Sequence, residues 1–333
     1  MTVSKTMLDA IAEHTTISVD TMWPDGALAI KPAGYFENAT SNQFHIWYMF
    51  NKKPSLMQEA IDYAKKFGYS VEEKENFVQQ VIYFAAAILG RDMLKIVKGC
   101  CLSQTNPAFA YDTEKTIASA EGFIKAYNKL GVPTEKVIIK VPSTFQALEA
   151  ATILKTKGIK TLGTMVHSLA QGIAAAEAGC VAISTYVDEL AANIDVSLLK
   201  EYDNLEDNYG WALTHDIHNY YRAYGIKTRN IAAAMIGLDV TIGLAGIDEM
   251  TIPIPCMEKL ASTAAPADFV PRLPSTVRVE DAPPEDKFMH DQAKLEAAIA
   301  GNKAATFRIA DAIATFKKYD SLTREMIMEA ISR

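Results

Sequence analysis

Short runs with the character of buried strands alternate with longer helical patterns along the whole chain. Between these runs, apolar residues recur every three or four positions, as at Ala120, Phe123 and Tyr127, which predicts helices with one face against a sheet. Ser143 and Ser168, each followed three residues later by glutamine, predict helix starts directly after two strands. Eight runs predict strands: Ile17–Asp20, Tyr35–Ala39, Leu94–Ser103, Val137–Val141, Thr161–Val166, Val181–Tyr186, Asn230–Ala234 and Met250–Pro253.

Eight strands alternating with helices in one chain predict a single α/β domain over residues 1–333, folded as a closed (β/α)8 TIM barrel. An open, doubly wound sheet is the alternative, but its usual nucleotide-binding patterns, GxGxxG and GxxxxGK[ST], do not occur. Five prolines make Thr263–Asp286 an extended connection. The helical patterns at Ala293–Ile299 and Ala304–Ile331 predict extra C-terminal helices packed across one end of the barrel.

Composition and charge narrow the class of function. The formal net charge is −7, no cluster of Lys and Arg stands out, and no apolar run reaches the roughly 20 residues of a membrane span. We therefore expect neither nucleic acid nor membrane as a partner. The first residues lack the apolar core of a secretory signal, and the four cysteines lack paired metal-ligand spacing, which favours a cytoplasmic protein with reduced thiols. His215 and His218 lack a third ligand at a standard spacing, so we expect no metal.

Lys140 is the residue that points most directly to chemistry. Strand alternation puts Ile138 and Lys140 on one face of the run that begins at Val137. If that face lines the barrel, burial lowers the pKa of the amine, and a neutral amine can form a Schiff base with a carbonyl. Asp20, at the end of another predicted strand, could move the proton of a substrate hydroxyl. The alternatives are a lysine that reaches solvent and an aspartate that caps a turn.

Several motifs together resemble the transaldolase family. The stretches Tyr111-Asp-Thr-Glu, Val137-Ile-Ile-Lys-Val-Pro-Ser-Thr-Phe-Gln-Ala and His167-Ser-Leu-Ala-Gln-Gly agree with it in order and spacing. The match runs without gaps from about Gly99 to Tyr186, and looser similarity extends from Ile17 to about Leu260. Transaldolases are (β/α)8 barrels that transfer a dihydroxyacetone unit between sugar phosphates through a lysine Schiff base. They need no cofactor, because the protonated imine itself accepts the electrons.

The resemblance implies a role for each matching residue. Lys140 would be the Schiff-base lysine, Asp20 the acid/base, and Thr164 a residue that helps to hold the catalytic water. Asn42 and Ser184 would lie near the hydroxyls of the bound donor, a small-molecule carbonyl compound. The resemblance is also consistent with a homodimer.

The departures from the family pattern concern five positions. Gln104 stands where the family has a catalytic glutamate and Tyr186 where it has phenylalanine, a pair that resembles the fructose-6-phosphate aldolase branch. Glu189 and Ile236 stand where the family has phosphate-binding arginines, and Leu162 where it has an asparagine that contacts the donor. Two charge-assisted contacts of about 1.5–3 kcal/mol each would be lost, and Glu189 would repel a phosphate dianion. These changes predict a non-phosphorylated or otherwise atypical substrate.

Three functions stay open at this stage. The first is a Schiff-base aldolase or transferase with a changed substrate range. The second is an ordinary pentose phosphate pathway transaldolase, in which other cations hold the phosphate. The third is a non-catalytic relative that acts as a binding protein, which the retention of Lys140, Asp20 and Thr164 argues against. The aromatic residues Phe44, Trp47, Tyr48 and Phe50 fit either core packing or an apolar wall at the barrel mouth.

Overall fold

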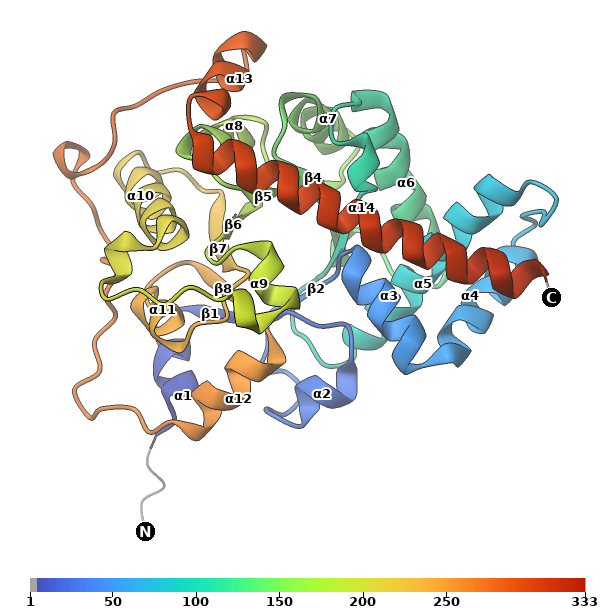
Figure 1. The fold of residues 1–333 in the computed structure, drawn as a ribbon, viewed down its shortest axis with the longest axis horizontal. Helices are drawn as coiled ribbons and strands as arrows, with labels where there is room; N and C mark the ends of the chain where they lie inside the picture. Colours follow the sequence, from blue (N-terminus) through green and yellow to red (C-terminus); the bar gives the residue numbers. More distant parts are fainter. Residues whose placement is uncertain (1–4, 333) are drawn as a thin grey trace.

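The computed structural model describes residues 5–332, in which eight parallel strands close into a barrel in sequence order (Figure 1). The predicted (β/α)8 barrel with extra C-terminal helices is therefore confirmed. Residues 1–4, part of the segment that lacks a secretory signal pattern, lie outside the described residues. The strands are β1 (Thr16–Val19), β2 (Ala39–Thr40), β3 (Cys101–Gln104), β4 (Val137–Pro142), β5 (Lys160–Val166), β6 (Ala182–Tyr186), β7 (Arg229–Ala233) and β8 (Glu249–Ile252).

Helices between the strands cover the outside of the barrel and leave its carboxyl-terminal mouth for side chains from several strands. Across residues 5–332, no helix is both long and apolar enough to cross a lipid bilayer. The helices are α1 (Met7–Ala12), α2 (Pro24–Leu28), α3 (Gln43–Lys52), α4 (Pro54–Lys66), α5 (Lys74–Met93), α6 (Thr113–Lys129), α7 (Phe145–Thr156), α8 (Leu169–Glu177), α9 (Leu190–Ile194), α10 (Tyr209–Ala223), α11 (Leu238–Gly243), α12 (Ile254–Ser262), α13 (Gln292–Ala300) and α14 (Lys303–Ser332).

The two faces of β4 pack in different environments. Val137 and Ile139 belong to the large core between the sheet and its helices, whereas Ile138 packs with Leu102, Leu162 and other residues inside the barrel. Strand alternation therefore directs Lys140 to the same inner side as Ile138, two residues further toward the mouth. This apolar layer lies beneath the lysine, on the side away from the mouth.

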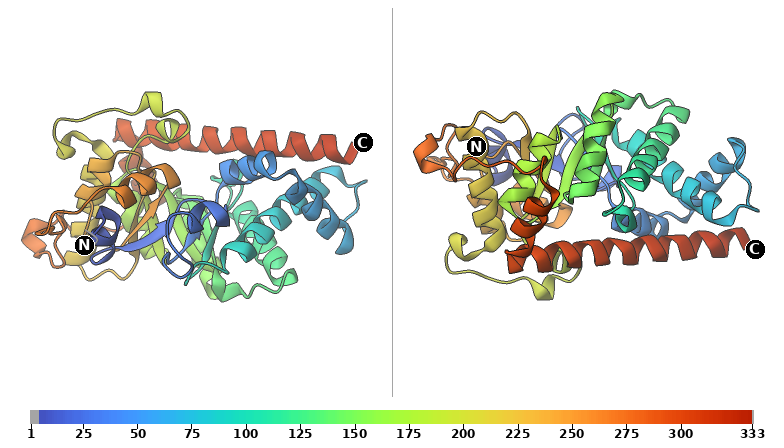
Figure 2. Two further views of the ribbon diagram at one scale, coloured as in Figure 1. Left: turned by 90° about the horizontal axis from the view of Figure 1, so that it is seen from below. Right: turned by 90° about the horizontal axis from the view of Figure 1, so that it is seen from above.

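The 30-residue helix α14 lies along one edge of the molecule, beside α3 and α9 (Figure 2). Its buried residues Ala312 and Phe316 pack with Tyr186 and Ala233, which lie at the carboxyl ends of β6 and β7. The helix therefore covers the mouth of the barrel, as expected for the C-terminal helices. The connection from 263 to 291 contains only one short 3-10 turn, Val279–Asp281, in agreement with its many prolines.

Two strands are several residues shorter than predicted. The run from Tyr35 yields only Ala39–Thr40, because the side chain of Asn38 replaces a backbone partner: its Oδ1 accepts the Cys100 backbone N–H at 2.8 Å. The run from Leu94 becomes a strand only at Cys101, since the residues after α5 continue in turns that bond back to the carbonyl of Met93.

One of the two predicted capping boxes is wrong. Ser168 begins α8, and its Oγ accepts the backbone N–H of Gln171 at 3.3 Å, as predicted. Helix α7 instead begins after Thr144, whose Oγ1 accepts the N–H of Ala147. Ser143 lies one residue before this cap: its backbone N–H donates to the Thr164 carbonyl of the neighbouring strand, and its Oγ has no hydrogen-bond partner.

Candidate active site

A cavity of about 360 Å³ opens at the carboxyl-terminal end of the barrel. Residues that follow β1, β2 and β7 line it together with side chains from β4 and β6 and with Phe316 of α14. This is the end at which the active sites of (β/α)8 enzymes lie. Six of the residues singled out in the sequence meet here: Asp20, Asn42, Lys140, Ser184, Tyr186 and Ile236.

Lys140 is 4% exposed and reaches the cavity from β4. Its Nζ donates to Thr40 Oγ1 at 3.0 Å and to the backbone carbonyl of Ser41 at 3.3 Å. Burial lowers the pKa of Lys140 to about 8, although the negative charge of Asp20 opposes this shift. At pH 7, Lys140 is therefore an uncharged amine in about a tenth of the protein molecules.

Asp20 follows β1 and lines the same cavity. Its Oδ1 lies 3.6 Å from Nε2 of His45, a residue in the first turn of α3. The carboxylate is close enough to Lys140 to raise the pKa of that amine. The site therefore combines one amine, one carboxylate and one imidazole.

Thr164, Tyr186 and Gln104 are buried polar residues on three strands of the barrel; Tyr186 lines the cavity, whereas Thr164 and Gln104 do not. Thr164 Oγ1 and the hydroxyl of Tyr186 hydrogen-bond at 3.2 Å, and burial raises the pKa of that phenol. Gln104 pairs with Lys140 in the β3–β4 register, and its Nε2 donates to Gln43 Oε1 at 2.9 Å. The Oε1 atom of Gln104 is buried without a hydrogen-bond partner, which leaves an acceptor available beside the lysine.

Gln43 was not identified in the sequence, although it follows Asn42 directly. Its Nε2 donates to the backbone carbonyls of Gln104 and Thr105, at 3.3 Å and 3.1 Å. It therefore fixes Gln104 through both side-chain and backbone contacts. Asn42 itself caps α3, since its Oδ1 accepts the backbone N–H of His45 at 3.1 Å.

Leu162 and Glu189 do not line the cavity. Leu162 is buried in the apolar layer inside the barrel. Glu189 precedes α9 and forms ion pairs with Lys200 at 2.6 Å and with Arg308 of α14 at 3.7 Å. The buried Arg308, which the sequence patterns did not bring to attention, is thus committed to an internal carboxylate.

Asp188 supplies a second internal anion near the same end of the site. Its Oδ2 accepts the backbone N–H of Ile236 at 2.8 Å and that of Gly237 at 3.4 Å. Its Oδ1 accepts from the side chain of Asn208 at 3.2 Å. The backbone donors of the loop after β7 are therefore already occupied by the protein's own carboxylate.

The rest of the cavity wall is mainly apolar. Phe44 and Tyr48 contribute to it, whereas Phe50 is buried in the core and Trp47 packs against Tyr319. Among the described lining residues, only Lys140 and His45 can carry a positive charge. The other apolar and aromatic lining residues include Trp23, Leu190, Ile194, Val196, Ile236, Ile254 and Phe316.

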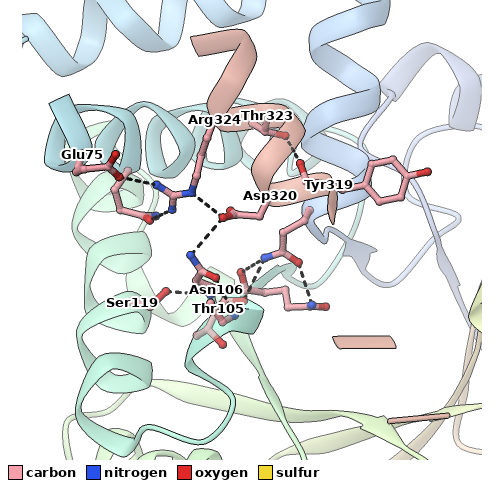
Figure 3. A network of polar contacts seen from close by, with 12 residues as sticks. Glu75, Thr105, Asn106, Ser119, Tyr319, Asp320, Thr323 and Arg324 are labelled. Atoms are coloured by element: carbon pink, nitrogen blue, oxygen red, sulfur yellow. Dashed lines mark hydrogen bonds and ion pairs between the residues drawn. The ribbon is translucent and has the colours of Figure 1, made fainter. Parts of the chain in front are cut away.

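A polar network fixes α14 over the mouth (Figure 3). Asp320 accepts from Arg324 Nε at 2.6 Å and from Asn106 Nδ2 at 3.4 Å. The backbone N–H of Asn106 donates to Ser119 Oγ of α6, and Arg324 also contacts Gln79 of α5. Because Asn106 follows β3 by two residues, this network ties α14 to the segment that carries Gln104.

The pair of histidines on α10 lies outside this site. His218 Nε2 hydrogen-bonds the carbonyl of Pro274 at 2.8 Å, and the ring of His215 stacks on Trp211. His167, after β5, is buried with its ring edge-to-face against Tyr186. Each of these imidazoles takes part in packing or in a bond to the backbone.

Comparison with known proteins agrees with this geometry. The sequence model of the family described as transaldolase/fructose-6-phosphate aldolase matches residues 17–325. A transaldolase of Actinobacillus pleuropneumoniae is 32% identical over 264 residues, which cover 78% of this chain and 80% of that protein. A transaldolase of Glaesserella parasuis is 34% identical over 265 residues (78% and 80%), and one of Saccharomyces cerevisiae is 31% identical over 264 residues (78% and 76%). The chain belongs to the transaldolase/fructose-6-phosphate aldolase family.

Proposed function

We propose that this protein is a class I aldolase or transaldolase that makes or breaks a C–C bond next to a ketone through a Schiff base on Lys140. One observation carries the proposal: a buried amine with a lowered pKa lies in the barrel-mouth cavity, where its hydrogen-bond partners are neutral oxygens and Asp20 is nearby. Such an amine is nucleophilic near neutral pH. A non-catalytic protein would gain nothing from burying it, since burial of an ammonium destabilises the fold.

The first step is imine formation. The neutral Nζ of Lys140 attacks the ketone carbon, and the resulting carbinolamine takes up a proton and loses its hydroxyl as water. The hydroxyls of Thr164 and Tyr186 can hold this water and pass its protons, whereas the free Oε1 of Gln104 can position the water as a hydrogen-bond acceptor but cannot relay a proton. The product is a protonated imine, which needs no cofactor to accept electrons.

The second step breaks the C–C bond. The carboxylate of Asp20 takes the proton of the hydroxyl on the β-carbon, the bond electrons move into the imine, and an aldehyde leaves. The remaining enamine is either protonated on carbon and hydrolysed, or attacks a second aldehyde. In the second case the proton on Asp20 returns to the new hydroxyl, so aldol cleavage and transfer use the same groups.

We further propose that the substrate lacks a phosphate group. No lysine or arginine other than Lys140 lines the described cavity, and the basic residues Lys200 and Arg308 are paired with Glu189. An apolar wall that includes Phe44, Ile236 and Phe316 suits a less polar carbonyl compound. The homodimer, the cytoplasmic location and the single-domain organisation stay predictions.

An ordinary transaldolase is the second candidate, and it is favoured by the names of the relatives that are about 30% identical. It would require phosphate contacts from basic residues that do not line this cavity. The two candidates differ in a measurable property, the preference for a phosphorylated over an unphosphorylated substrate.

Steady-state kinetics separate these candidates. We expect a fluorogenic β-hydroxy ketone that releases a naphthaldehyde to be cleaved with a higher kcat/KM than fructose 6-phosphate. Lys140→Met should abolish cleavage. Lys160→Met, at the amino-terminal start of β5 and away from the mouth of the barrel, should leave cleavage unchanged. Efficient transfer from fructose 6-phosphate would favour the second candidate, and equal activity of Lys140→Met and wild type would refute Schiff-base chemistry at this residue.

A further inference from the structure

His45 is a buried imidazole at the acid/base end of the site that the motif comparison did not assign. It lies in the first turn of α3, where its backbone N–H donates to the capping Asn42. Its side chain lines the cavity, and Nε2 lies 3.6 Å from Asp20 Oδ1. The other ring nitrogen, Nδ1, is buried without a hydrogen-bond partner.

The carboxylate has few other partners. Within residues 5–332, no donor forms a hydrogen bond to the side chain of Asp20, and His45 is the one basic side chain within 4 Å of it. A carboxylate that must accept a hydroxyl proton from a particular direction needs a group that fixes its orientation. His45 Nε2 needs to move only a few tenths of an ångström to reach hydrogen-bond distance.

Two charged groups determine the state of the imidazole: Asp20 at the end of β1 and Lys140 on β4. Burial lowers the pKa of His45 and the positive charge of Lys140 also lowers it, whereas Asp20 and a hydrogen bond with the backbone of Thr40 raise it. The net direction is downward, so the ring is neutral at pH 7 and carries one N–H. A proton on Nε2 faces the Asp20 carboxylate, which can accept it.

We propose that His45 is a positioning residue for Asp20, which holds the carboxylate through an Nε2–H donor while the carboxylate takes up and returns the substrate hydroxyl proton. This inference rests on the proposed function and deepens it. His45 acts only in the C–C step, since its Nε2 faces the carboxylate and Lys140 forms its own bonds to Thr40 and Ser41.

The two chemical steps allow a sharp test. Borohydride trapping with hydroxyacetone reports imine formation, and release of naphthaldehyde from the fluorogenic β-hydroxy ketone reports C–C cleavage. His45→Leu should lower kcat for cleavage about 10- to 100-fold, with adduct yield and KM within about twofold of wild type. His45→Gln, whose amide can still donate, should recover most of this loss. In wild type, the rate of cleavage relative to the rate of imine trapping should fall as the pH decreases through a value below 6.5, where the imidazole becomes charged; His45→Gln should lack this additional decrease.

His218→Gln is the matched control, because it removes another buried imidazole that is bonded to Pro274 on the outer side of the barrel. His218→Gln should leave the rates of adduct formation and of C–C cleavage unchanged. The inference is wrong if His45→Leu cleaves at the wild-type rate, or if the Leu and Gln variants lose adduct formation, cleavage and thermal stability to the same extent. Absence of an adduct on the wild-type protein would instead overturn the proposed function itself, and the inference with it.

Discussion

The side-chain nitrogen of Lys140 donates a 3.0 Å hydrogen bond to Thr40 Oγ1, so a hydroxyl on the shortest strand of the barrel holds the amine of β4. The second acceptor, the carbonyl of Ser41, is also uncharged. A contacting carboxylate would stabilise the ammonium form, whereas neutral oxygens favour it less. The arrangement keeps the amine oriented toward the cavity and still able to lose its proton.

Removal of the amine should stabilise the protein. The pKa of Lys140 is about 8, against about 10.4 for an unfolded lysine, so the folded state disfavours the proton. The resulting destabilisation is complete below pH 8 and disappears as the pH rises toward 10.4. Lys140→Met should therefore raise the free energy of unfolding by about 2–3 kcal/mol at pH 7, and by less at pH 9.5. Denaturant unfolding at the two pH values measures this, and a variant less stable than wild type at both would contradict it.

Imine formation should follow the titration of the same amine. With a pKa of about 8, the free-amine fraction rises about tenfold between pH 7 and pH 9 and then approaches a plateau. The initial rate of borohydride trapping with hydroxyacetone should follow this curve. An ordinary lysine would instead give a nearly hundredfold rise over the same interval, without a plateau.

The hydroxyl of Tyr186 should act in the imine-forming step. It lines the same cavity as Lys140 and is oriented by its bond to Thr164, so we expect it to hold the departing water. We expect Tyr186→Phe to lower the initial trapping rate about 10- to 100-fold. Tyr221→Phe removes a comparable buried hydroxyl bond, to the carbonyl of Gly172 behind the sheet, and should leave the rate unchanged. Equal rates for Tyr186→Phe and wild type would exclude the phenol from water handling.

Glu189 should disfavour phosphorylated substrates. Its carboxylate pairs with Lys200 and Arg308 outside the cavity lining, so Glu189→Ala leaves these two basic side chains without this carboxylate. The ratio of the KM for glyceraldehyde 3-phosphate to the KM for glyceraldehyde should fall about tenfold. This is the change in affinity expected from one charge-assisted hydrogen bond. Glu121→Ala removes a surface carboxylate paired with Lys157 elsewhere, and it should leave the ratio unchanged. An unaltered ratio in Glu189→Ala would show that this pairing has no part in specificity.

The fold was largely predictable, because an alternation of period-two and period-3.6 patterns is local in sequence. The inner-face position of Ile138, and with it the direction of Lys140, follows from strand alternation alone. The predicted strand and helix boundaries were wrong where a hydrogen bond forms that the local sequence pattern does not specify. Asn38 takes over a ladder bond through its side chain, and the backbone of Ser143 stays in the sheet where its sequence predicts a helix cap.

The candidate site was predictable only in part. Single residues at strand ends, such as Asp20, could be proposed from their chemistry and from the family motifs. Contacts between residues far apart in the sequence could not be predicted. Gln43 hydrogen-bonds Gln104, which is 61 positions away, and Arg308 of the C-terminal helix pairs with Glu189. His45 was missed for the same reason, because only the folded barrel brings α3 beside the end of β1.

The most direct measurement is the location of the covalent adduct. The protein is reduced with borohydride in the presence of hydroxyacetone, and proteolytic peptides are then mapped by mass spectrometry. We expect one added donor unit on the peptide that contains Lys140, and none on the Lys140→Met variant. An adduct on a different lysine, or no adduct on the wild-type protein, would contradict it.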